Sequence, residues 1–530
     1  MRSTILFAVA SLQLAAHAQL TNGCFTIGGP QYEQARAVVQ TSDGGYAFAG
    51  LTYSFSASSG DENCYMVKTD ANGVVQWNVG YGNNTPPGFH TEFTTDMIQT
   101  SDGGYALAGF GDPTYMGFMK LDATGAVQWI MQYDMLDPDA VDDLYAVVQT
   151  PDGGYLLAGA ATNDMVAIKT DAAGVIEWSK VYDNNIFGYM EAYDAVVATG
   201  GGYALCGWPT GTGGMQVLRL EESGDVLWAK SYGGGFSDFG HALAATPDSG
   251  LVVAGRTRHY GFASAADQQD DGFVVKVDKD GDLDWARAFG GDSLSEEFLG
   301  VVPTSDGGYA MAGLAAVPPL GIGAPKMYVV KCDANGQRLW SQKLATNFLT
   351  GQAWDIIEST DGGLVVAGAV NVSGDVQCSF MKMEADGTIC PTCGAEPYGS
   401  DSAAVFTPVD LAITVFDSVA TATSYTVDDY PGGTAVIGCL QTGVAEIPAS
   451  EGSFALSPNP TSDLCRVMLN DARNITALEL ISLQGATLLS MPINGRSRID
   501  IPLDRLAEGS YILRTTGAGQ MQQAMLVVVR

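Results

Sequence analysis

The sequence is poor in positive charge and in histidine. It holds 25 lysines and arginines against 59 aspartates and glutamates, which gives a formal net charge of −34 at pH 7. A chain this acidic repels the phosphates of nucleic acids and the anionic surfaces of membranes, so we expect neither as a partner. Of the four histidines, only His90, His241 and His259 lie beyond the first 18 residues. No Ser-His-Asp or Gly-x-Ser-x-Gly arrangement is spelled locally, so conventional nucleophilic catalysis is not indicated.

The sequence also lacks membrane-length apolar runs, metal-ligand spacings and phosphate-binding loops. Beyond the N-terminus no segment reaches the ~20 uninterrupted apolar residues of a membrane helix. The Gly-Gly turns are not followed by the lysine-serine pair of a phosphate loop. The segment 278–284 is rich in aspartate, but an EF-hand there would need an acidic ligand at Lys276 and a glutamate at Arg287. We therefore predict no metal, no nucleotide and no other cofactor.

The first 18 residues have the pattern of a secretory signal peptide. Arg2 precedes an apolar stretch at 5–16, and Ala16-His17-Ala18 is a small-x-small cleavage site. We expect the mature chain to begin at Gln19, outside the cytoplasm.

A repeat dominates the rest of the chain. Seven times a turn around Asp-Gly-Gly-Tyr is followed by a short apolar strand and then, in most copies, by Lys-x-Asp-x-x-Gly-x-x-x-Trp, and the turns succeed one another in steps of 48 to 59 residues. A repeat of this size fits one four-stranded propeller blade. The sequence therefore predicts an all-β fold with a seven-bladed β-propeller over residues 19–393. The turns fall at Asp43, Asp102, Asp152, Gly200, Asp248, Asp306 and Asp361.

Each copy can be divided into four strands. In the first copy we expect strands at 37–41 and 46–51, a third that ends at Lys68-Thr69-Asp70, and a fourth that carries Trp77. The Asp-Gly pairs favour tight hairpins because such turns need positive φ. The tryptophan holds one repeat position, so we interpret it as packing between blades rather than as a ligand contact. It recurs as Trp129, Trp178, Trp228, Trp285 and Trp340.

The seventh copy lacks its outer strand. Lys382, Glu384 and Gly387 are in register, but Pro391 stands where the tryptophan belongs. The segment 25–29 matches the end of the fourth strand in other copies, so we expect it to complete the seventh blade. Joining segments this far apart in the chain costs roughly 5 kcal/mol of closure entropy, which a disulfide would offset in part.

Nine cysteines, an odd number, leave at least one without an intramolecular partner. The Cys390-Pro-Thr-Cys393 pair has no second pair at zinc-ligand spacing, so we interpret it as structural. We predict disulfides among Cys24, Cys378, Cys390 and Cys393. One alternative sets Cys378 opposite Cys393 and leaves Cys390 near Cys24, and another joins Cys24 to Cys393. We expect Cys206 to be a buried free thiol.

The repeat ends near residue 393, and two further regions follow. Residues 394–453 are rich in alanine, threonine, serine, valine and aspartate, and we interpret them as a linker or a small irregular cap in which 411–416 could pair as a strand. Residues 454–530 alternate short apolar strands with turns, which predicts a separate small β-sandwich domain.

This last region opens with Pro-Asn-Pro, has a strand-Gly-strand hairpin in its middle and carries Leu-x-x-Gly-x-Tyr near its end. In these features it resembles the C-terminal sorting domain of proteins exported by the bacterial type IX secretion system. The resemblance implies export across the outer membrane, with that machinery and a sortase-like peptidase as partners. The peptidase removes the domain and releases the protein or attaches it to surface lipopolysaccharide, so the protein is expected to be secreted or on the cell surface. The family commonly ends in a lysine-rich strand, whereas this chain ends in Val-Val-Val-Arg. The marks of the resemblance are Pro458, Asn459, Pro460, Gly485, Gly509 and Tyr511.

The repeats in turn are similar to the DGGY-type propeller repeats of secreted proteins that carry this sorting domain, which implies architecture only. Within such a propeller the loops on one face differ most between copies. They carry aromatic side chains and arginines, which are common at recognition sites. Our candidates for ligand binding are Phe93, Tyr189, Arg256, Arg258, His259, Tyr260 and Trp354.

We predict a non-catalytic binding or adhesion module for an extracellular glycan or protein. The alternative is a secreted propeller enzyme that acts on polysaccharide as a glycoside hydrolase or lyase, and a third possibility is a structural spacer without a small ligand. Acidic pairs such as Glu296-Glu297 and Asp142-Asp143 would suit a glycosidase, but in so acidic a chain we interpret them as solvated loops.

Overall fold

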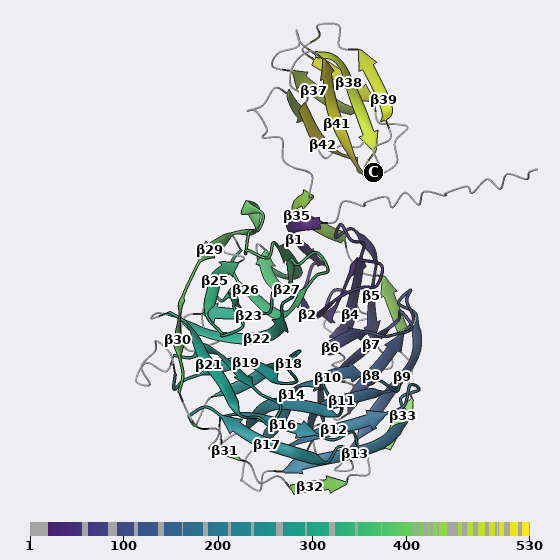
Figure 1. Ribbon diagram of the computed structural model, residues 1–530. Helices are drawn as coiled ribbons and strands as arrows, with labels where there is room; N and C mark the ends of the chain where they lie inside the picture. The colour runs from purple at the N-terminus through teal and green to yellow at the C-terminus, as the bar shows by residue number, and fades with distance from the viewer. Residues whose placement is uncertain are drawn as a thin grey trace, which may run out of the picture. The chain divides into compact units, whose positions relative to one another are not determined.

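The computed structural model describes an all-β chain between residues 20 and 528 (Figure 1). The described part divides into two compact units, residues up to Gly443 and residues from Val444. Residues 1–19, which include the predicted signal peptide, lie outside the described part. Within it the segments not described are 56–61, 83–92, 111–114, 136–141, 162, 184–188, 210–213, 235–237, 261–268, 292–293, 317–323, 345–347, 373, 406, 408, 411–413, 418–420, 425–427, 432–433, 443–453, 458–463, 470–474, 483–486, 493–495, 497, 503–508 and 518–521.

The described strands of the first unit form seven antiparallel sheets, which we call sheets 1 to 7. In order from the innermost strand outward, sheet 1 contains β2 (Glu33–Gln40), β3 (Tyr46–Thr52), β4 (Asn63–Thr69) and β5 (Val75–Gly82); sheet 2 contains β6 (Phe93–Gln99), β7 (Tyr105–Phe110), β8 (Met116–Leu121) and β9 (Val127–Asp134); sheet 3 contains β10 (Asp143–Gln149), β11 (Tyr155–Ala161), β12 (Asp164–Thr170) and β13 (Ile176–Asp183); sheet 4 contains β14 (Met190–Val197), β15 (Tyr203–Pro209), β16 (Met215–Leu220) and β17 (Val226–Tyr232). Sheet 5 contains β18 (Phe239–Ala245), β19 (Leu251–Thr257), β20 (Asp271–Val277) and β21 (Leu283–Gly290); sheet 6 contains β22 (Ser295–Pro303), β23 (Tyr309–Ala316), β24 (Lys326–Cys332) and β25 (Arg338–Leu344); sheet 7 contains β26 (Gly351–Glu358), β27 (Leu364–Val372), β28 (Asp375–Met383) and β1 (Leu20–Gly28).

Each sheet buries apolar side chains against the next sheet in chain order. Tyr81 of sheet 1, for example, packs in one cluster with Met97 and Leu107 of sheet 2. The seventh sheet packs on the first in the same way, since Phe380 shares a cluster with Tyr46 and other side chains of sheet 1. Strands β3, β4, β11 and β20 are buried along their whole length, as a sheet covered on both faces requires. The arrangement is propeller-like.

The N-terminal strand completes sheet 7, as the sequence predicted. β1 pairs antiparallel with β28, and Phe25 lies opposite Phe380. The predicted hairpins are also confirmed in the first copy: Gly44 and Gly73 have φ of +83° and +78°, in the region that glycine enters without a steric cost. The innermost strand β2 begins at Glu33, earlier than the predicted 37.

Residues 395–442 form a belt of seven short strands rather than the predicted linker or cap. Each strand pairs antiparallel with the outermost strand of one sheet, and the belt visits sheets 6, 5, 4, 3, 2, 1 and 7 in that order. Figure 1 shows β31, β32 and β33 on the outer rim. Edge strands expose unpaired backbone groups, and the belt covers them. Its strands are β29 (Ala395–Pro397), β30 (Ser400–Ala403), β31 (Val409–Asp410), β32 (Thr414–Asp417), β33 (Thr421–Ser424), β34 (Asp428–Pro431) and β35 (Thr434–Thr442).

Side chains anchor the first part of the belt. The Tyr398 hydroxyl donates a hydrogen bond to Glu296 Oε1 of sheet 6. Burial raises the pKa of Glu296 to about 9, so this carboxyl is protonated at neutral pH. Arg287 Nη1 of sheet 5 lies 3.3 Å from Asp401 Oδ2.

The described strands of the second unit form two small antiparallel sheets. β36 (Phe454–Ser457), β37 (Leu464–Leu469) and β40 (Arg498–Pro502) form one, and β39 (Thr487–Pro492), β38 (Ile475–Ser482), β41 (Gly509–Gly517) and β42 (Gln522–Val528) form the other. Val467, Leu480 and Leu513 are buried in them. Gly509 and the buried Tyr511 lie in β41, whereas Pro458, Asn459, Pro460 and Gly485 lie outside the described residues.

Across both units, the residues described include no helix of the length and apolarity that crossing a membrane requires.

Candidate functional site

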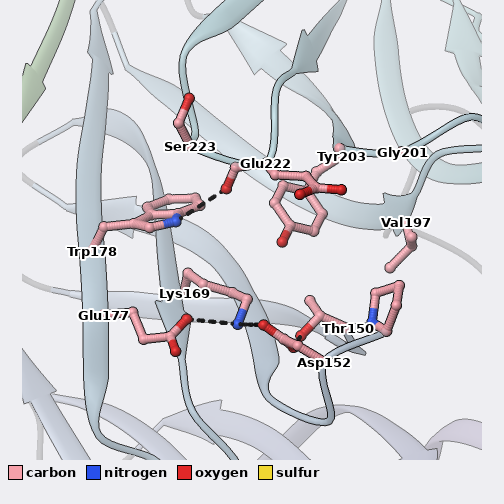
Figure 2. Close-up of a pocket in the computed structure, with 12 residues that line it drawn as sticks. Thr150, Asp152, Lys169, Glu177, Trp178, Val197, Gly201, Tyr203, Glu222 and Ser223 are labelled. Atoms are coloured by element: carbon pink, nitrogen blue, oxygen red, sulfur yellow. Dashed lines mark hydrogen bonds and ion pairs between the residues drawn. The ribbon is translucent and has the colours of Figure 1, made fainter.

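The hairpin ends of six of the seven described sheets of the first unit carry the same ion pair. In sheet 3, Lys169 Nζ lies 2.8 Å from both Asp152 Oδ2 and Glu177 Oε2, and it donates a third hydrogen bond to the Thr170 carbonyl (Figure 2). The hydrogen bond from Lys169 is the main reason that the pKa of Asp152 falls to about 2. Asp152, Lys169 and Glu177 line a groove of about 470 Å³.

The groove is a structural feature, because its contacts recur around the ring. In sheet 4, where Arg219 replaces the lysine and a glycine turn replaces the aspartate, the guanidinium instead donates to the carbonyls of Tyr203 and Leu220. The same lysine–aspartate pair occurs in the five other sheets as Lys68–Asp43, Lys120–Asp102, Lys276–Asp248, Lys331–Asp306 and Lys382–Asp361.

The repeated tryptophan packs between sheets, as predicted. Trp178 lies 6.3 Å from the Tyr203 ring of the next sheet and donates a hydrogen bond from Nε1 to the Glu222 carbonyl (Figure 2). Trp228, Trp285 and Trp340 donate equivalent hydrogen bonds to the following hairpin. These side chains join the sheets to one another.

The other end of each innermost strand carries a β-bulge. In β14 the register passes from Ala192 to Asp194 and leaves Tyr193 unpaired. The strand opposite holds Gly207, where a Cβ atom would lie only 1.7 Å from the Glu191 carbonyl oxygen, so only glycine fits this approach. A bulge turns the unpaired side chain in a new direction. The seven bulged residues are Arg36, Thr95, Tyr145, Tyr193, His241, Leu299 and Trp354.

All seven bulged side chains line one cavity of about 300 Å³, which we call the axial cavity, together with Glu297 and Gln352. Every sheet of the ring thus contributes one bulged residue to a common space. The repeat is nearly uniform elsewhere, but six residue types occupy these seven positions. The bulge therefore converts a repeated scaffold into a chemically varied site.

Aromatic rings form an arc along part of the cavity wall. The ring centroids of Tyr145 and Tyr193 are 5.1 Å apart, and those of Tyr193 and His241 are 4.9 Å apart. On sheets 1 and 7, the Arg36 guanidinium lies 4.6 Å from the centroid of Trp354, in cation–π geometry. Ring separations of this size are favourable between aromatic groups and hold the side chains in place.

One ion pair closes the arc. His241 Nε2 lies 2.6 Å from Glu297 Oε1, and Arg256 Nε lies 3.5 Å from the same oxygen. Burial raises the pKa of Glu297, but His241 and Arg256 more than offset this and bring the pKa below its usual value. Burial also raises the pKa values of Tyr145 and Tyr193, so both hydroxyls keep their protons at neutral pH.

Three buried carboxyls lie directly after bulges and also line the space at the ring axis. Asp96 accepts a hydrogen bond from the backbone N–H of Val147, in the next sheet, at 2.8 Å. Asp194 and Asp355 accept equivalent hydrogen bonds from sheets 5 and 1. Burial is the main cause that raises the pKa of Asp96 to about 7, that of Asp355 to about 6 and that of Asp194 well above its usual value. These carboxyls join neighbouring sheets.

The candidate residues of the loop face occupy different places. Trp354 lines the axial cavity, and Arg256 stands beside it, with its guanidinium 4.0 Å from the Phe239 ring centroid. Tyr189 is 54% exposed and is not among the residues that line the cavity. Phe93 is the first residue of β6, and its side chain lies outside the described ones.

The remaining three candidates make local contacts within sheet 5. Arg258 donates hydrogen bonds from Nε and Nη2 to the two carboxylate oxygens of Asp270. His259 Nδ1 lies 3.3 Å from Asp238, and the Tyr260 ring stacks 5.8 Å from Phe273. These side chains hold the turn after β19.

Sequence reasoning missed most of the axial cavity. The acidic pairs interpreted as solvated loops are not solvated: Glu296 and Glu297 lie in β22 and are 0% and 9% exposed, and Asp142 is 3% exposed. The partners of Glu296 and Glu297, which are Tyr398 and His241, come from distant segments, and a linear sequence does not display such contacts. One signal was available, since every bulged residue lies seven positions before the turn residue of its own repeat.

The predicted disulfide pairings need correction. Cys24, Cys378 and Cys393 are free thiols, and Cys390 is disulfide-bonded to none of them. Cys378 packs toward sheet 1 with Phe25, whereas Cys393 packs toward sheet 6 with Cys24, so the two residues belong to different clusters. Because alternate residues of a strand face opposite sides of a sheet, Cys378 lies on the face of sheet 7 that packs on sheet 1, away from Cys393. The Cys393 and Cys24 thiols share a hydrogen bond. Cys206 is a buried free thiol, as predicted.

The aspartate-rich hairpin at 278–284 is built like the other hairpins of its kind. Asp278 Oδ1 accepts the backbone N–H groups of Asp280 and Asp282, as Asp171 does with the residues of its own turn. No group of three or more potential metal ligands occurs among the described side chains.

Comparison with solved structures gives distant similarities. A protein of unknown function from Bacteroides caccae is 12% identical with a TM-score of 0.35, over 56% of this chain and 93% of that one. Drosophila Plexin A, solved in complex with Semaphorin 1b, is 9% identical with a TM-score of 0.29, over 67% and 88%. Trypanosoma rangeli sialidase, solved in complex with sialic acid, is 10% identical with a TM-score of 0.27, over 97% and 89%. No curated protein matches the chain.

One family comparison is specific. Residues 455–529 match the family described as the secretion system C-terminal sorting domain. This range coincides with the strands of the second unit, from β36 to β42. The chain thus carries a type IX secretion sorting domain, and the protein is secreted or displayed at the cell surface.

Proposed function

We propose that this protein is a seven-bladed β-propeller with a C-terminal β-sandwich sorting module, and that it acts outside the cell as a non-catalytic binding or adhesion module. The observation that carries the proposal is the ring of bulged side chains. One repeat position faces a common cavity and varies from sheet to sheet, while the hairpin ends retain the same ion pair. Pockets lined by aromatic groups and a few placed polar groups are typical of ligand sites.

Binding is favoured over hydrolysis because the acidic groups at the axis already accept hydrogen bonds that join the sheets. Asp96, Asp194 and Asp355 each accept backbone hydrogen bonds from two sheets. A glycosidase needs two carboxyl groups placed on either side of the scissile bond, one of them able to donate a proton. Glu297 pairs with His241, and its lowered pKa suits an acceptor rather than a proton donor.

The alternative, a secreted enzyme that acts on polysaccharide, draws support from that same pair. A histidine held 2.6 Å from a buried carboxylate is an arrangement that general acid–base catalysis uses. If the protein is such an enzyme, we expect Glu297→Gln to abolish turnover.

Export completes the proposal. The sorting domain begins beyond the boundary at Gly443 between the two units, so its removal leaves the ring and the belt whole. We expect the mature extracellular protein to lack the last 75 or so residues. Mass spectrometry that finds Arg530 on extracellular protein would contradict this processing step. Deletion of residues 454–530 should retain the protein in the periplasm.

The function is tested with the exported protein on a glycan array and on immobilised extracellular proteins, together with an assay for release of reducing sugar. Binding without turnover, weakened by Tyr193→Ala, supports the binding module. Turnover that Glu297→Gln abolishes supports the enzyme instead. Binding that Tyr193→Ala leaves unchanged would remove the axial cavity from the proposal.

A further inference from the structure

We infer that the axial cavity binds one uncharged sugar unit at the end of a glycan chain, between the arc of Tyr145, Tyr193 and His241 and the opposing Trp354. This inference rests on the proposed binding function and names its ligand class. It draws on the size of the cavity, its rings, its hydrogen-bonding groups and its charge.

The size of the cavity favours a single ring-sized unit. Its volume of about 300 Å³ lies at the lower end of the range for small-molecule sites. All seven sheets contribute to its wall, so it is a depression at the axis rather than a groove along one sheet. A ligand that enters end-on fits this shape, whereas a chain lying lengthwise would need an open groove.

The rings supply a surface for a pyranose. Tyr145, Tyr193 and His241 are consecutive along the wall, with centroids 5.1 Å and 4.9 Å apart. The face of an aromatic ring carries partial negative charge, and the C–H groups on one face of a pyranose carry partial positive charge, so the two surfaces attract. The tyrosines also keep their hydroxyl protons, because burial raises their pKa values.

The polar groups of the cavity match a ligand that both donates and accepts hydrogen bonds. Trp354 Nε1 is buried and has no acceptor among the described residues. A buried donor without a partner costs free energy, which a ligand hydroxyl oxygen would recover. Gln352 offers both a donor and an acceptor, and Glu297 offers an acceptor. Sugar hydroxyl groups serve both roles.

The charge of the site favours a neutral sugar over an acidic one. The cations at the cavity are already engaged, since Arg36 lies on the Trp354 ring and His241 and Arg256 lie at Glu297. Glu297 lines the cavity and its pKa is lowered, so it is a carboxylate at neutral pH. A sugar carboxylate would add a second negative charge next to it, which would disfavour its binding.

The test uses the full-length protein without its signal peptide and ligand-observed NMR titration. The probes are neutral methyl hexopyranosides, the matching uronic acids and neutral disaccharides. We expect the neutral probes to bind and the uronic acids to bind at least about tenfold more weakly. We expect Trp354→Phe, which keeps a ring but removes the donor, to weaken binding by about tenfold. We expect Tyr193→Ala to weaken it at least as much.

Trp178→Phe is the matched control, because it makes the same exchange at the hairpin end and outside the axial cavity. It should leave affinity unchanged, and circular dichroism should show that all variants are folded. Tighter binding of uronic acids, or equal effects of Trp178→Phe and Trp354→Phe, would overturn the inference while the binding function stands. If no saccharide binds but a protein partner does, the inference also fails. If neither class of ligand binds, the proposed function itself fails.

Discussion

The hairpin end and the bulged end of each innermost strand lie only seven residues apart. The residues at the hairpin end repeat from sheet to sheet, whereas those at the bulged end vary. At the hairpin end six of the seven sheets use the same lysine–aspartate pair, and sheet 4 replaces it with Arg219 and backbone carbonyls. At the bulge almost every sheet differs. At the hairpin end, the backbone N–H groups of Ser42 and Ser101 donate to Gln99 and Gln149 of the next sheet, so a change in one sheet can disturb its neighbour. The bulged side chains face open space, and each is free to differ.

The largest loss of stability should come from adding a side chain where two strands approach closely at a bulge. We predict that Gly207→Ala lowers the free energy of unfolding by about 3 kcal/mol or more, because its Cβ would lie 1.7 Å from a backbone oxygen. Gly153→Ala, at the hairpin end of sheet 3, has no atom within 4 Å and should cost only about 1 kcal/mol through its positive φ. Denaturant unfolding measures both. Equal losses would mean that the bulge tolerates change as well as the turn does.

Breaking the repeated ion pair should lower the free energy of unfolding by a smaller amount. Lys169→Met should cost about 1–2 kcal/mol, because the ammonium group is buried while its two carboxylate partners are half exposed and solvated. Ligand affinity should not change. Thermal unfolding and the NMR titration test the two statements separately, and a loss of affinity would show that the hairpin end takes part in binding.

The two ends of strand β6 should respond to pH with opposite signs. Burial raises the pKa of Asp96 to about 7, so the folded state holds a proton that the unfolded state has released, and stability falls as pH rises from about 4 to 7. In Asp102, after the strand, hydrogen bonds from Thr100 and Lys120 outweigh burial and lower the pKa to about 2, so its stabilisation is lost as pH falls from about 4 to 2. We predict that Asp96→Asn flattens the first slope and that Asp102→Asn flattens the second. Melting temperatures from pH 2.5 to 8 measure both, and slopes of the same sign would contradict the comparison.

The smallest effects on stability should come from the cavity side chains themselves. Tyr145→Phe removes one hydrogen bond, from its hydroxyl to Asp143 at 3.2 Å, and should change stability by less than about 1 kcal/mol. The same holds for Leu299→Met, which conserves volume. Chemical unfolding is the measurement, and a loss comparable to that of Gly207→Ala would show that the bulged side chains are part of the scaffold.

The parts of the fold that the sequence predicted are those that repeat locally. The hairpin glycines, the tryptophan position and the missing strand at residues 25–29 are all visible as departures from, or copies of, one pattern. The bulge was not predicted, because its shift in hydrogen bonding leaves no unusual residue on its own strand. Its mark is a glycine on the strand opposite, such as Gly207, which pairs with Ala192 next to the bulged Tyr193.

The belt and the buried acids were not predicted for a different reason. A strand such as β31, of two residues, is too short to show any alternation of apolar and polar positions. From the sequence alone, Glu296 and Glu297 are expected to be exposed to solvent. In the structure they contact Tyr398 from the belt region and His241 from another sheet. A contact between distant segments cannot be recognised in the sequence, because each of the two residues appears there without its partner.

The order in which the belt visits the sheets has a consequence for how the chain assembles. Its first strand pairs Ala395 with Leu344, and a late one pairs Asp428 with Gly82, so the sequence separation grows at every step. Once the first strand has docked, however, the next sheet edge is only a few residues of belt away, and each closure costs little additional entropy. The belt can therefore close like a zipper, from sheet 6 around to sheet 7. Its final strand, β35, docks on β1, the first described strand of the chain, so the belt ends by joining the two ends of the described part of the unit.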